Sequence, residues 1–122
     1  MNAPPRGVTP LVRWLLMEVL RRPRPELRTT MDRLLDRLDE LEGHLPWSGS
    51  AQVDEIAARF LEAGQCYRLA LLGMSDYLKA RHPGGWARAA RHARRGAALL
   101  EQADALNYRL RETLSRGVGC RL

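Results

Sequence analysis

The sequence predicts an all-α fold, an antiparallel helical bundle of about four helices in a single domain. Three observations support this class. Apolar residues recur at intervals of three and four over most of the chain, as they do on the buried face of a helix. Proline and glycine stand where these stretches begin and end. The length of 122 residues is close to the commonest size of one domain, which leaves room for a single core.

The first predicted helix covers residues 9–22. Thr9 is a suitable N-cap, Pro10 fits the first helical position, and Pro23 requires the helix to end at the residue before it. We expect residues 1–8, which hold two prolines and a glycine, to form a flexible tail. The helix is apolar around most of its circumference, which is typical of a core helix, an oligomer contact or a helix on a membrane surface. Burial in the core is the preferred interpretation.

The second predicted helix runs from Pro25 to Gly43 and carries a heptad seam of apolar residues. That seam consists of Leu27, Met31, Leu34, Leu38 and Leu41. Charged residues occupy the opposite side, so an amphipathic bundle helix explains the whole segment. The loop that follows ends at Ser50, which is the predicted N-cap of the next helix.

The third predicted helix, residues 51–81, has the strongest periodicity and is expected to be long and central. Its apolar row alternates steps of three and four, and consists of Val53, Ile56, Phe60, Ala63, Tyr67, Ala70, Met74 and Tyr77. About thirty helical residues span roughly 45 Å, whereas a compact domain of this length is only about 36 Å across. Either the domain is elongated or the helix kinks near Gly73.

The fourth predicted helix covers residues 86–114 and follows the helix-ending segment 82–85. Its clearest apolar row consists of Leu99, Ala103, Leu106, Leu110 and Leu114. We expect residues 116–122 to form a second flexible tail. The folded domain would then comprise residues 9–115.

The net charge of +6 arises from one segment of the chain. Between Tyr77 and Leu100 six basic residues occur and no acidic residue, while the rest of the chain holds 14 of each sign. The segment predicts a cationic surface for phosphates or an acidic partner, formed by Lys79, Arg81, Trp86, Arg88, Arg91, His92, Arg94 and Arg95. The plainer alternative is a solvated helix face. Nineteen arginines against one lysine is a bias that GC-rich codons of a bacterial genome also produce.

No catalytic or metal-binding pattern is recognisable in the sequence. Glu40 and His44 stand four residues apart, and Cys66 and His92 belong to helices predicted to be neighbours. Two ligands are too few for a metal site, and a helix-end contact and a small buried thiol explain these residues more simply. A nucleophile elbow and a phosphate-binding glycine loop are both lacking. We therefore expect no enzymatic activity, no metal and no cofactor.

These observations favour a small non-enzymatic protein-interaction module, an adaptor or subunit of a larger assembly that binds another protein or itself in an oligomer. The candidate interface consists of apolar residues outside the main seams, Trp14, Leu61, Leu69 and Leu72. The alternative is a nucleic-acid-binding subunit that uses the basic segment 79–95. Two cysteines without a disulfide framework favour the cytoplasm. The apolar stretch 11–20 is too short to span a membrane, so a peripheral membrane role ranks third.

Overall fold

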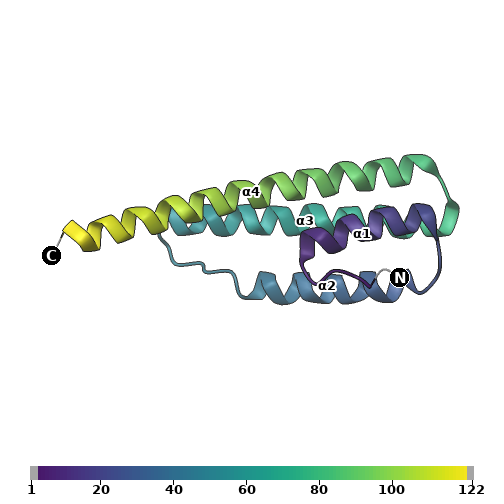
Figure 1. The fold of residues 1–122 in the computed structure, drawn as a ribbon, viewed down its shortest axis with the longest axis horizontal. Coiled ribbons are helices and arrows are strands. Elements are labelled where there is room, and N and C mark those ends of the chain that lie inside the picture. The colour runs from purple at the N-terminus through teal and green to yellow at the C-terminus, as the bar shows by residue number, and fades with distance from the viewer. Residues whose placement is uncertain (1–2, 121–122) are drawn as a thin grey trace.

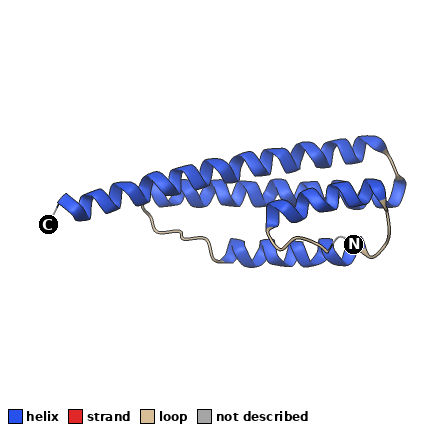
Figure 2. Cartoon of the chain, in the orientation of Figure 1, coloured by secondary structure: helices blue, strands red, loops and turns tan. Residues whose placement is uncertain are grey.

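The computed structural model describes residues 3–120, with side chains up to Arg116, and every regular element in that range is an α-helix (Figure 1, Figure 2). The helices are α1 (Val8–Arg21), α2 (Leu27–Gly43), α3 (Ala51–Ala80) and α4 (Pro83–Cys120). The predicted all-α bundle of four helices is confirmed. None of the helices within residues 3–120 combines the length and the apolar character needed to cross a lipid bilayer.

A long antiparallel hairpin of α3 and α4 sets the shape of the molecule (Figure 1). α3 contacts all three other helices, as predicted for a central helix. α3 is continuous through Gly73. The predicted alternative of an elongated domain is therefore confirmed, and the alternative of a helix that kinks near Gly73 is wrong. A Cβ atom at Gly73 would stand 2.9 Å from the Cβ of Ala89 and 3.0 Å from the carbonyl oxygen of Gly85. The missing side chain therefore permits the close approach of the two helices.

The turn between α3 and α4 is fixed by one residue in the left-handed backbone region. Arg81 has a φ of 56°, and its N–H donates to the carbonyl oxygen of Tyr77 at 2.7 Å, which ends α3 at Ala80. α4 begins at Pro83, three positions before the predicted start, because proline is well accommodated in the first turn of a helix.

The C-terminal end of α4 differs from the prediction. The helix was expected to end at Leu114 and to be followed by a flexible tail from 116 to 122, but it continues to Cys120. The glycines in this stretch lower helix stability by only about 1 kcal/mol each, so they do not end it. Residues 121 and 122 lie outside the described part of the chain.

The N-terminal end of α1 also differs from the prediction. The helix begins at Val8 with Gly7 at the N-cap, so it starts one residue before the predicted start and Thr9 is not the cap. The hydroxyl of Thr9 is instead hydrogen-bonded to the phenol of Tyr67 on α3, with 2.8 Å between the two oxygens. This bond fixes the start of α1 against the central helix.

The main core lies in the half of the molecule next to the α3–α4 turn, where α1 and α2 cover the hairpin (Figure 1). α1 is a core helix, as preferred, and the predicted seams of α2 and α3 supply most of the rest. The largest side chains buried there are Val12, Leu15, Val19, Leu27, Leu34, Tyr67 and Met74. Two members of the predicted rows are exceptions, since Leu41 and Leu114 are exposed.

Candidate functional site

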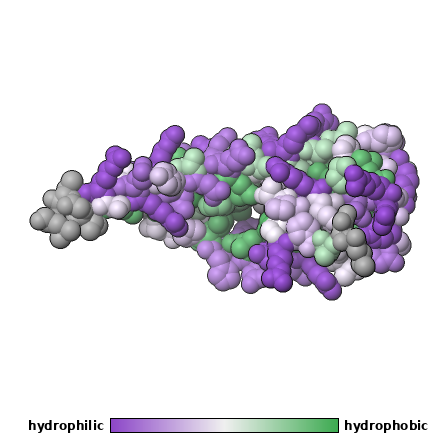
Figure 3. Space-filling model, viewed as in Figure 1, coloured by the Kyte–Doolittle hydropathy of each residue, from purple (hydrophilic) through white to green (hydrophobic). Residues whose placement is uncertain are grey.

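An apolar groove of about 350 Å³ lies between the C-terminal end of α2, the loop 44–50 and the α3–α4 hairpin. Figure 3 shows hydrophobic surface in this region, bordered by hydrophilic side chains. We call this feature the apolar groove. Its main lining residues are Leu38, Leu41, Leu45, Phe60, Leu61 and Leu100.

The groove exists because the first two helices are much shorter than the other two. α1 has 14 residues and α2 has 17, whereas α3 has 30 and α4 has 38. In the part of the chain that the structure describes, no helix covers the end of the hairpin that lies away from its turn. Phe60 and Leu61 of α3 therefore lie beyond the main core and are only half-buried.

Local hydrogen bonds hold the loop that borders the groove. The ring of His44 donates from Nδ1 to the carbonyl oxygen of Glu40 at 2.7 Å, which closes the end of α2. This is the helix-end contact predicted for the pair in preference to a metal site. The N–H of Ser48 donates to Oδ1 of Asp54 at 2.9 Å. Ser50 is the N-cap residue of α3, as predicted, but its side chain makes no capping hydrogen bond.

The rim of the groove along α2 is acidic. Asp39 and Glu42 both accept hydrogen bonds from the guanidinium of Arg68, at 2.7 Å for Asp39. The hydrogen bond to Glu42 is the largest cause of a raised pKa at Arg68. One arginine serves two carboxylates, and the last turn of α2 contains no basic residue to balance the negative end of the helix dipole. The rim therefore favours positively charged ligands.

The four predicted interface residues occupy different places. Leu61 lines the apolar groove. Leu69 and Leu72 are exposed on α3. Trp14 is half-buried against the core, and its indole N–H is buried without an acceptor among the described residues.

Two of the groove residues were expected in the core from the sequence. Leu41 and Phe60 belong to predicted buried rows, yet Leu41 is 47% exposed and Phe60 lies in the groove. The lengths of the predicted helices could have identified these two residues as uncovered. The first two predicted helices are too short to cover the third and fourth along their full extent, so some apolar row had to remain uncovered.

The members of the predicted cationic surface have different surroundings in the structure. Arg88 and Arg91 are exposed on α4 and form no ion pair among the described residues. Arg95 is paired with Glu62 of α3 at 2.9 Å. The guanidinium of Arg81 lies 6.0 Å from the ring centroid of Tyr77.

The remaining members of this predicted surface are also divided. Lys79 is exposed at the end of α3, and His92 is half-buried. Trp86 is half-buried too, and its indole N–H donates to the carbonyl oxygen of Leu16 at 2.8 Å. The Trp86 ring thus anchors α4 to α1, whereas the sequence placed it in the cationic surface.

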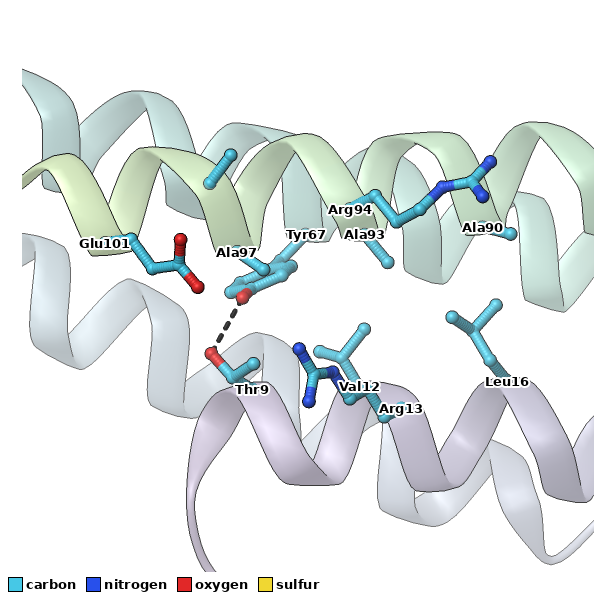
Figure 4. Close-up of a pocket in the computed structure, with 11 residues that line it drawn as sticks. Thr9, Val12, Arg13, Leu16, Tyr67, Ala90, Ala93, Arg94, Ala97 and Glu101 are labelled. Carbon is cyan, nitrogen blue, oxygen red and sulfur yellow. Dashed lines mark hydrogen bonds between the residues drawn. The ribbon is translucent and has the colours of Figure 1, made fainter.

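Arg94 faces a crevice of about 300 Å³ between α1 and α4 (Figure 4). Arg13 and Thr9 line it from α1, Tyr67 from α3, and Arg94 and Glu101 from α4. Burial raises the pKa of Tyr67, and the hydrogen bond with Thr9 and the charge of Arg13 offset part of that rise. Thr9 is the hydrogen-bonding partner of the phenol, so no base activates it as a nucleophile.

A metal centre is not assembled in the described part of the chain, where no three His, Cys, Asp or Glu side chains gather. Cys66 is buried beside Ala63 and Leu99, as expected of a small apolar side chain. Burial raises the pKa of its thiol, an effect that the charge of Arg95 only partly opposes. The thiol is therefore protonated and unreactive near neutral pH.

Comparison of the chain with protein-family models, with curated proteins and with solved structures finds no match. The function is therefore inferred from two features of the structure. They are the apolar groove with its acidic rim and the exposed arginines of α4.

Proposed function

We propose that this protein is a non-enzymatic protein-interaction module whose apolar groove binds an amphipathic helix. The apolar groove is the observation that carries the proposal, because the exposed Leu41 and the half-buried Phe60 and Leu61 line it together. Contiguous apolar surface of this kind marks interaction sites. A groove between helices is also a common receptor for the apolar face of a partner helix.

The acidic rim specifies the chemistry of that partner. Asp39 is 71% exposed and Glu42 is 42% exposed, so both carboxylates reach solvent beside the apolar lining. A helix with a leucine row and flanking Lys or Arg would match both features, and like charges would repel an acidic helix. We place this adaptor or small subunit in the cytoplasm, where the free thiol of Cys66 would stay reduced.

Fluorescence anisotropy with two labelled peptides tests the proposal. One peptide is an amphipathic helix with a leucine row and basic flanks, and the other has the same row with acidic flanks. We expect the basic peptide to bind more tightly. Leu41→Glu should weaken its binding about tenfold or more, because a charge replaces apolar contact area.

Leu20→Glu is the matched control for that experiment. Leu20 is 41% exposed on α1 and lies outside the groove, so its variant should bind the basic peptide as the parent does. Equal binding of the two peptides, or an undiminished affinity in Leu41→Glu, would contradict the proposed function.

A second candidate function is nucleic-acid binding, and one observation favours it. Arg88, Arg91 and Arg94 are exposed, and none of them is ion-paired within the described residues. Binding to a labelled oligonucleotide should then weaken steeply with salt and be lost when the three arginines become alanine. The same affinity in the triple variant would count against this candidate.

A further inference from the structure

We infer that the helix bound in the apolar groove is the C-terminal part of α4, residues 106–116, from a second copy of this chain. Two copies would then exchange these segments in a symmetric dimer. This inference rests on the proposed function, because it names the partner of the same groove.

The C-terminal part of α4 extends beyond the start of α3 (Figure 1). Gln52, in the first turn of α3, and Thr113 of α4 line the same small pocket, so α4 passes the end of α3 shortly after Thr113. Leu114 is consequently 62% exposed. The part of α4 around Leu114 is thus not covered by α3.

This helix end carries the apolar row that the groove requires. Leu106, Leu110 and Leu114 follow one another at intervals of four and so lie on one face of α4. Leu106 and Leu110 are half-buried beside α3, and the row continues to Leu114 after α3 has ended. Leu114 is therefore the member of the row that is free to enter a groove as an anchor residue.

The charge of the same segment complements the rim of the groove. Arg109, Arg111 and Arg116 are exposed, and Glu112 is the one acidic residue between Leu106 and Arg116. The facing rim of a second copy presents the exposed carboxylates of Asp39 and Glu42, which share Arg68 as their one cationic partner among the described residues. Opposite charges across such a contact accelerate association and fix its orientation.

Symmetry allows both contacts to form at once. The C-terminal end of α4 lies at the end of the hairpin away from its turn (Figure 1). The loop 44–50 borders the groove and runs to the start of α3 at that same end, so a two-fold axis there relates segment to groove and groove to segment. The accessible surface of 8295 Å² also exceeds the roughly 6600 Å² of a compact chain of this mass. The excess is larger than the about 800 Å² that each partner buries in a typical stable interface.

Sedimentation equilibrium of the full chain and two single variants tests this dimer. We expect the parent protein to be dimeric. Leu41→Glu in the groove and Leu114→Glu on the segment should each raise the dimer dissociation constant about a hundredfold. Both leucines are exposed within one chain, so the variants should fold, which circular dichroism checks. Leu20→Glu, exposed on α1 and outside the groove, should leave the dimer intact.

Mixing the two variants gives the sharpest result. The Leu41→Glu chain keeps an intact segment and the Leu114→Glu chain keeps an intact groove, so the mixture should recover one of the two contacts and form a heterodimer. A mixture that stays monomeric while the parent dimerises would overturn the inference. So would a parent dimer that Leu114→Glu leaves unchanged.

The outcome also separates this inference from the function on which it rests. A parent chain that is monomeric but binds the basic peptide overturns the second copy as the occupant and retains the helix-binding groove. A monomeric chain that binds no such peptide overturns both. If the dimer forms as inferred, the monomeric Leu114→Glu variant has a free groove and should bind a labelled peptide of residues 103–116.

Discussion

Gly96 of α4 lies directly against the phenol ring of Tyr67 on α3. A Cβ atom at Gly96 would stand 2.7 Å from Cε1 and 2.9 Å from Cδ1 of that ring. Tyr67 is 1% exposed and belongs to the main core, so its ring has little room to move. The glycine therefore sets how closely α4 packs on the central helix, although glycine is otherwise unfavourable within a helix.

Gly96→Ala should destabilise the protein for this reason. Overpacking costs about 1–3 kcal/mol, which exceeds the gain of about 1 kcal/mol in helix propensity. Gly64→Ala is the matched control, since a Cβ there meets nothing within 4 Å, and it should stabilise the fold by up to about 1 kcal/mol. Urea unfolding measures both, and equal effects at the two positions would contradict the close packing of Gly96.

Tyr67→Phe tests the hydrogen bond between α3 and the start of α1. Removing the phenol oxygen eliminates the 2.8 Å contact with Thr9 and should lower the free energy of unfolding by about 1 kcal/mol. Thr9→Val should have a similar effect. Because both variants break the same bond, the double variant should cost clearly less than the sum of the two, and strict additivity would refute the contact.

Arg24→Met tests an ion pair in which one partner is buried. The carboxylate of Glu18, with a side chain 9% exposed, accepts a hydrogen bond from Arg24 at 2.9 Å. Losing the arginine leaves that charge without compensation, so unfolding should become easier by about 1–2 kcal/mol. Adding Glu18→Gln should recover part of the loss, because a neutral amide is less costly to bury.

The solvated ion pair of Arg59 and Glu55 provides the comparison for that variant. Its carboxylate side chain is 52% exposed, so Glu55→Ala should change stability by less than about 0.5 kcal/mol. If Arg24→Met has an effect as small as that of Glu55→Ala, the Glu18 carboxylate is better solvated than its burial indicates.

Cys66 should make the stability of the fold depend on alkaline pH. Burial raises the pKa of its thiol in the folded chain above the ordinary value of 9.0, so the unfolded state releases this proton first. The contribution is fully present below that value and is lost as the pH rises through the folded pKa. Urea unfolding at increasing pH should therefore show a shallower decline for Cys66→Ala than for the parent protein. Parallel curves would contradict a buried, protonated thiol.

The sequence by itself determined the helices and most of the core. Apolar steps of three and four are a local property of each segment, and prolines and glycines act on the backbone within a few residues. The seam of α2 and the central row of α3 could therefore be predicted, and Leu34 and Met74 are buried as expected. The same local pattern does not determine whether an apolar row packs against another helix. Leu41 and Leu114 continue their rows and yet are exposed.

Only the tertiary structure decided which surfaces remain open. The indole of Trp86 donates a hydrogen bond to the carbonyl oxygen of Leu16 on α1, and Arg95 forms an ion pair with Glu62 on α3. The spacing of residues in α4 predicts neither partner. Whether an apolar row is covered depends on the relative lengths and positions of several helices. Burial of a side chain is a property of the assembled molecule, because the atoms that exclude water from it come from segments far away in the chain. The apolar groove arises in this way, from two short helices packed on two long ones.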